Sequence, residues 1–106
     1  MPNRIQHAIE KIDNYVDTIY KDYGEGMIQL PEIVKEMQEI IIQFLSKIEK
    51  YNQYGEDIQV NVILNQLDEL LQAIKWRDPI QMVDTLEYEI KESLIVYEEM
   101  VCKYGE

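Results

Sequence analysis

The clearest helix start in this chain lies in the stretch DPIQMVDTLEYEI, residues 78–90. Asp78 is a residue type that accepts hydrogen bonds from the free N–H groups of a first turn. Pro79 suits the first helical position, where its missing N–H would have no partner, and Gln81 completes the pattern of a capping box. Beyond this start, apolar residues continue at steps of three and four: Val83, Leu86, Ile90, Leu94, Tyr97, Val101 and Tyr104. The pattern predicts an amphipathic helix over residues 79–104.

The same spacing recurs three times upstream. It predicts helices over residues 3–23, 29–53 and 57–76, with Pro31 in the first turn of the second. No segment shows the period of two that is typical of strands. Because short loops make successive helices neighbours, we predict an all-α fold with a single domain over residues 1–106. The predicted arrangement is an antiparallel up-down-up-down four-helix bundle.

The tripeptide Tyr-Gly-Glu occurs three times, at residues 23–25, 54–56 and 104–106. Each copy lies where an apolar helical pattern ends. Glycine just after a helix adopts the left-handed conformation that satisfies the last carbonyl groups, and a tyrosine before it covers the end of the core. We therefore interpret all three copies as helix C-caps.

Charge and composition exclude several classes of function. The 106 residues include 21 acidic and 10 basic side chains, a net charge of −11. This balance argues against nucleic-acid binding and against docking to an anionic membrane. The single Cys102 excludes an internal disulfide, the N-terminus lacks a signal-peptide pattern, and no apolar run reaches the roughly 20 residues of a membrane span. We expect a cytoplasmic protein.

The sequence does not favour an enzyme. His7 and Cys102 both lie near expected helix ends, which is a poor setting for thiolate–imidazole chemistry. Di-metal helical bundles need histidines that follow glutamates at fixed offsets, and the chain has one histidine. A carboxylate-only metal hydrolase and a small-ligand-binding regulatory bundle are the alternatives, but we predict no catalytic residue, no cofactor and no metal site.

Some apolar residues are not accounted for by the predicted core. On a wheel of 100° per residue centred on Val83, a lateral stripe forms from Tyr88, Ile95 and Cys102, and Val96 widens it. A second surplus edge, on the helix predicted over 57–76, comprises Ile58, Val62 and Trp76. One interpretation is that flanking bundle positions commonly carry such residues and that Trp76 plugs the pole near Tyr20 and Tyr23. The other is a homodimer seam or a partner groove centred on the last helix.

The segment from Met82 to Lys91 resembles one in small uncharacterised helical proteins of Gram-positive bacteria. Those proteins carry Ala-Asp-Leu-Leu-Glu-Tyr-Glu-Leu after an Asp-Tyr or Asp-Trp helix start, sometimes in motility or cell-surface gene settings. Matching residues are Asp84, Leu86, Glu87, Tyr88 and Glu89, whereas Val83, Thr85 and Ile90 replace Ala, Leu and Leu. The resemblance covers about a quarter of the chain. It implies a bacterial helical protein and transfers no catalytic residue.

The excess negative charge lies mainly on the last helix, since residues 78–106 hold eight of the acids and two of the bases. An aromatic residue flanked by acids on a rigid helix suits a basic or amphipathic protein partner, although Glu87 and Lys91 can equally form an ordinary i,i+4 pair. We predict a non-enzymatic, homodimeric interaction module with an adaptor-like or export-chaperone-like role. The predicted interaction residues are Asp84, Glu87, Tyr88, Glu89, Ile95, Val96 and Cys102.

Overall fold

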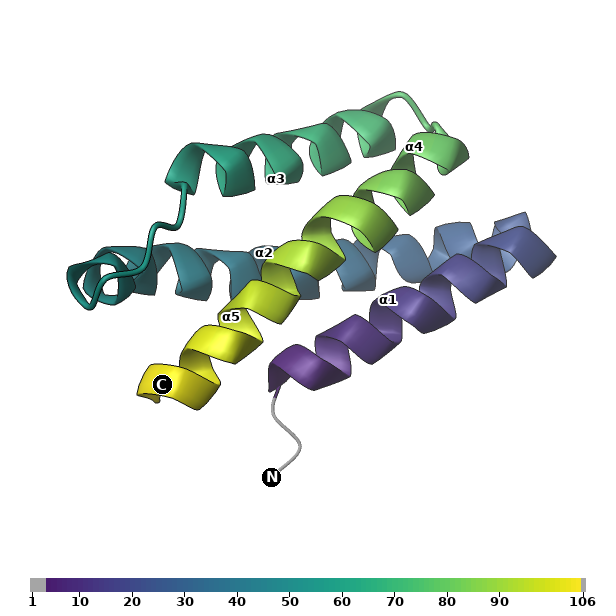
Figure 1. Cartoon of the computed structure of the whole chain (residues 1–106). Helices are drawn as coiled ribbons and strands as arrows, with labels where there is room; N and C mark the ends of the chain where they lie inside the picture. The colour runs from purple at the N-terminus through teal and green to yellow at the C-terminus, as the bar shows by residue number, and fades with distance from the viewer. Residues whose placement is uncertain (1–3, 106) are drawn as a thin grey trace.

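A computed structural model describes residues 4–105, and over that range it contains helices and no strands (Figure 1). The elements in chain order are α1 (Arg4–Lys21), α2 (Tyr23–Gln53), α3 (Val60–Lys75), α4 (Pro79–Asp84), the π-helical η1 (Thr85–Ile90) and α5 (Lys91–Tyr104). Because α4, η1 and α5 follow one another without a break, they form one rod. The all-α class predicted from the sequence is confirmed.

The core lies mainly between α1, α2 and the rod formed by α4, η1 and α5. Tyr15, Phe44 and Leu86 are among its fully buried side chains. Burial raises the pKa of Tyr15 to about 12, and its hydroxyl lies 4.0 Å from the Met82 sulfur. The helix α3 is different, because its only buried residues are Ile63, Leu70 and Ala73. It runs along one edge of the molecule, where it contacts α4 and η1 and, less extensively, α2 (Figure 1).

The junction of α1 and α2 corrects the predicted boundaries. Only Asp22 separates the two helices, and its carboxylate accepts a hydrogen bond from the Glu25 N–H at 3.2 Å, so it caps the start of α2. The absence of a side chain at Gly26 permits close packing, since a Cβ there would lie 2.9 Å from Cβ of Ile19. Residues 23–25 therefore open α2 and do not cap α1. The predicted end of the first helix at residue 23 and the predicted start of the second at residue 29 are therefore wrong. Pro31 lies inside α2 and not in its first turn. Residue 3, the predicted start of the first helix, falls outside the described range.

The other two glycines behave as expected at helix ends. Gly55 and Gly105 follow α2 and α5 with φ values of 106° and 81°, although residue 106 of the last tripeptide lies outside the described range. The start of α3, predicted at residue 57, is wrong by three residues. The Asn52 side chain accepts from the Ile58 N–H at 2.9 Å and donates to the Ile58 carbonyl at 3.1 Å, which holds the segment before α3 in a non-helical conformation.

The start of the last rod is as predicted, but its interior is not a regular α-helix. The Asp78 carboxylate accepts from the Gln81 N–H at 3.1 Å, and Pro79 is the first residue of α4. Within η1 the hydrogen bonds span five residues, as in the bond from the Lys91 N–H to the Leu86 carbonyl. This wider turn rotates all later residues relative to a regular helix. A wheel of 100° per residue drawn from Val83 therefore does not hold for α5.

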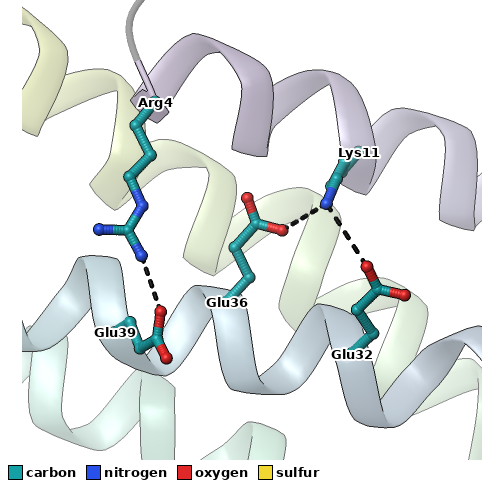
Figure 2. A network of polar contacts seen from close by, with 5 residues as sticks. All are labelled: Arg4, Lys11, Glu32, Glu36 and Glu39. Carbon is teal, nitrogen blue, oxygen red and sulfur yellow. Dashed lines mark hydrogen bonds and ion pairs between the residues drawn. The ribbon is translucent and has the colours of Figure 1, made fainter.

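Ion pairs join α1 to α2 along one side (Figure 2). Lys11 Nζ lies 2.6 Å from Glu36 and 3.8 Å from Glu32, while Arg4 pairs with Glu39 at 2.8 Å. The hydrogen bond to Glu36 is the main cause that raises the pKa of Lys11. Such exposed pairs contribute about 0–1 kcal/mol each, so the buried apolar faces stabilise this helix pair and the ion pairs help to fix its register. Over the described residues, no helix combines the length and apolarity needed to cross a membrane.

Candidate functional site

The candidate site is a pocket of about 330 Å³ between α3 and α5, which we call the α3–α5 pocket. Its apolar lining includes the buried Phe44 of α2, the half-buried Ile58 and Val96, and the exposed Val62. The exposed acidic side chains of Asp57 and Glu92 also line it, and no lysine, arginine or histidine does. The pocket thus combines an apolar surface with negative charge.

Two sets of hydrogen bonds position the walls of the pocket. The clamp between Asn52 and Ile58 holds the segment that precedes α3 against the end of α2. Further along, the Ser93 hydroxyl of α5 donates to the Gln66 side chain of α3. Because Ser93 is buried, this contact satisfies a polar group that would otherwise cost free energy in the core. The first contact fixes the segment before α3 to α2, and the second fixes α3 to α5.

A pair of carboxyl groups lies at the boundary between α3 and η1. Glu69 and Glu89 share a hydrogen bond, and this contact, together with desolvation and the repulsion between the two groups, raises the pKa of Glu89 to about 7. One proton is therefore held between the two helices at mildly acidic pH and is released as the pH rises through neutrality. The negative charge of this side of α3 consequently increases with pH.

The structure divides the predicted interaction residues between separate surfaces. Val96 lines the α3–α5 pocket, whereas Ile95 and Cys102 lie together in a shallow hollow of about 570 Å³ that α5 alone lines, with Glu98, Glu99, Met100 and Lys103. Tyr88 is 66% exposed on η1. Asp84 is exposed, and Glu87 and Glu89 are half-buried. The single stripe expected from the helical wheel is not continuous, because η1 rotates α5 relative to α4.

Two further expectations are corrected. Trp76 is 72% exposed, with the Lys75 ammonium 5.6 Å from its ring, so it does not plug the pole near Tyr20 and Tyr23. Lys91 pairs with Asp13 of α1 at 2.7 Å, and not with Glu87, because the π-helical turn changes which side chains share a face. Lys91 therefore joins η1 and α5 to α1.

Sequence reasoning identified part of the pocket and missed its acidic members. Ile58 and Val62 were flagged as a surplus apolar edge, and the structure brings them together with Val96. Asp57 and Glu92 were not predicted as site residues, since nothing in the local sequence marks them as binding residues. Asp57 and Glu92 come together because the hydrogen bonds between Asn52 and Ile58 fix the position of the segment before α3. Helical periodicity contains no information about that contact.

No protein-family model, curated protein or solved structure matches this chain. Within residues 4–105, no three histidine, cysteine, aspartate or glutamate side chains gather into a group that could hold a metal ion.

Proposed function

We propose that this protein is a non-enzymatic interaction module that binds a basic, amphipathic segment of another protein in the α3–α5 pocket. The observation that carries the proposal is the composition of that pocket, in which Val62 and Val96 provide apolar surface beside the carboxylates of Asp57 and Glu92, with no cationic side chain in the lining.

Lysine and arginine side chains match this surface in both of their parts. Their aliphatic stems pack on apolar side chains such as Val62, while their charged ends reach Asp57 or Glu92 in the solvent. The net charge of −11 favours the same partner, because a negative protein attracts basic segments over long distances and repels acidic ones. Lysine-rich or arginine-rich amphipathic helices combine the two properties.

The remaining predicted interaction residues extend this proposal. Glu87, Tyr88 and Glu89 lie on η1, which contacts α3, and Asp84 is the last residue of the preceding α4. Ile95 and Cys102 form a secondary contact on the other hollow of α5. We propose an adaptor-like or export-chaperone-like role in the cytoplasm, and a relationship to the small helical proteins of Gram-positive bacteria that share the Leu86–Glu89 segment.

We also propose the antiparallel up-down-up-down bundle as the arrangement that presents the pocket. Contacts between α1 and α2 support it, because residue numbers rise along one helix as they fall along the other, from Arg4 with Glu39 to Lys11 with Glu36 and Glu32. The pairs Gln66 with Ser93 and Glu69 with Glu89 follow the same rule for α3. The Phe44 ring of α2 stacks on the Tyr97 ring of α5, and the Tyr51 ring stacks on the Tyr104 ring. The residue numbers of the two partners differ by the same amount in both pairs, as expected for parallel helices at diagonal positions of the bundle.

A pair of synthetic peptides tests the proposed function. One is an amphipathic helix of leucine and lysine of about 18 residues, long enough to form a helix on binding, and the other replaces every lysine by glutamate. We expect the Leu/Lys peptide to bind, as followed by fluorescence anisotropy at moderate salt, and the Leu/Glu peptide not to bind. The double variant Asp57→Lys with Glu92→Lys should weaken the Leu/Lys complex about tenfold or more, as the loss of two charge contacts predicts.

The control for charge alone is Glu10→Lys with Glu49→Lys, which changes the net charge by the same amount on exposed positions of α1 and α2. It should weaken binding much less than the pocket variant. Equal effects of the two double variants would show that the peptide responds to overall charge and would refute the pocket as the site.

A further inference from the structure

An apolar stripe runs along the flank of α3 on which Leu71 and Ile74 lie beside α2. Three of its members, Val60, Leu64 and Leu71, are 40%, 45% and 42% exposed, and Leu67 and Ile74 are half-buried. Leu71 and Ile74 share a hollow with Val34 and Lys35 of α2. We call this surface the α2–α3 seam. It is separate from the α3–α5 pocket, so the inference below does not rest on the proposed function.

The stripe on α3 has two properties that point to a self-complementary contact. Its members lie at steps of four, three, four and three residues, which is the spacing of a coiled-coil seam. The order is also symmetric about Leu67, with a leucine at each inner position and a β-branched residue at each end. Two copies of α3 packed antiparallel would therefore place Leu64 against Leu71, Val60 against Ile74 and Leu67 against itself. A two-fold interface needs such a surface, which is complementary to its own rotated copy.

The charge beside the stripe fits a second copy better than a basic partner. The residues that follow its five members are Asn61, Asn65, Asp68, Gln72 and Lys75, and their net charge is zero. A chain with a net charge of −11 repels its own copy over most of its surface, but this flank of α3 adds no net negative charge to that repulsion. A basic partner, for the same reason, would gain no electrostatic attraction here.

We propose that the α2–α3 seam is the interface of a two-fold symmetric homodimer in which α3 of one chain packs antiparallel against α3 of a second chain. The sixteen residues of α3 span about 24 Å, so at a helix width of about 10 Å this helix alone offers a footprint of roughly 250 Å² in projection. Since a standard interface buries about 800 Å² per partner, we expect a weak dimer that exchanges with the single chain and is not obligate.

The first test is the mass in solution as a function of concentration. Sedimentation or light scattering from about 1 µM to several hundred µM should show a rise from 12.7 kDa toward twice that mass. Leu64→Asp with Leu71→Asp should remain at the mass of a single chain. The control Ile80→Asp changes a side chain that is 73% exposed on α4 and should dimerise like the wild type. A wild type that stays monomeric throughout, or a control that loses the dimer equally, overturns the proposal.

Cysteine cross-linking tests the antiparallel register and does not depend on destabilising variants. In a Cys102→Ser background, Leu64→Cys and Leu71→Cys are prepared as separate proteins and then mixed under mild oxidation. The mixture should form covalent dimers much faster than either variant alone, because residue 64 of one chain faces residue 71 of the other. Rapid cross-linking of Leu64→Cys alone, or none in the mixture, contradicts the proposed packing.

The symmetry also predicts one strengthening variant. Asp68 follows Leu67, so the two-fold axis brings the Asp68 carboxylates of the two chains toward each other. Asp68→Asn should shift the midpoint of dimer formation to a lower protein concentration, by about threefold as expected for relief of one exposed like-charge contact. An unchanged midpoint, or one at higher concentration, would contradict the position of the axis.

Discussion

Replacing Glu89 by glutamine removes the proton that η1 and α3 share. In the folded protein the hydrogen bond with Glu69, aided by desolvation and repulsion, raises the pKa of Glu89 from 4.5 to about 7. Between these two values the folded chain holds a proton that the unfolded chain releases. The shared proton therefore stabilises the folded state fully below pH 4.5. This stabilisation is lost as the pH rises through 7.

The magnitude follows from the size of that pKa difference and from the exposure of the site. At 1.36 kcal/mol per pKa unit, the difference between 4.5 and about 7 corresponds to at most about 3 kcal/mol. Glu89 is only half-buried, so solvent screening reduces this contribution, and we expect about 1 kcal/mol. The amide of glutamine keeps the hydrogen bond to Glu69 without titrating.

The assay is urea unfolding followed by circular dichroism at pH 5 and pH 8. Glu89→Gln should match the wild type at pH 5 and exceed its free energy of unfolding by about 1 kcal/mol at pH 8. The control Glu87→Gln removes the same charge from the same turn and should retain the pH dependence of the wild type. The reasoning fails if Glu89→Gln follows the wild-type pH dependence, or if Glu87→Gln flattens it to the same extent.

Two packing predictions follow from close contacts elsewhere. Gly26→Ala should lower the free energy of unfolding by about 1–3 kcal/mol, because the new Cβ would lie 2.9 Å from Cβ of Ile19. As a control, alanine at the exposed Gly24 should be neutral or stabilising. Thermal unfolding of the two variants measures both effects. Asn52→Ala should lower the free energy of unfolding by about 1–3 kcal/mol, because the N–H and carbonyl of Ile58 lose their hydrogen-bond partner. Amide exchange at Ile58 should accelerate. Unchanged exchange there would count against the clamp.

The helical class and most core positions were accessible from the sequence because they depend on local periodicity. The rod over residues 79–104 is an example, since Val83, Leu86, Ile90 and Leu94 are all buried as their spacing predicted. The junction of α1 and α2 was predicted wrongly because its glycines were interpreted as a stop. The Asp22 to Glu25 spacing is itself a helix-start signal, and it outweighs the glycines once Ile19 and Gly26 pack closely.

The candidate site was less accessible, for two physical reasons. The π-helical turn in η1 leaves no clear trace in residue type, yet it rotates α5 and so separates Ile95 from Tyr88. On α3, the three-four spacing does not distinguish the exposed Leu64 and Leu71 from the fully buried Leu70, because that difference depends on α3 packing against η1 and α4 more than against α2. Which flank of a helix is covered depends on contacts between distant segments.

The central claim is that the α3–α5 pocket binds a basic, amphipathic segment, and hydrogen–deuterium exchange with the Leu/Lys peptide tests it most directly. On saturation with the peptide, amide exchange should slow in residues 57–66 and 92–96, which line two sides of the pocket, while the ion-pair face of α1 and α2 keeps its rate. Slowing confined to other segments, or no slowing at peptide concentrations that saturate binding, would contradict the claim.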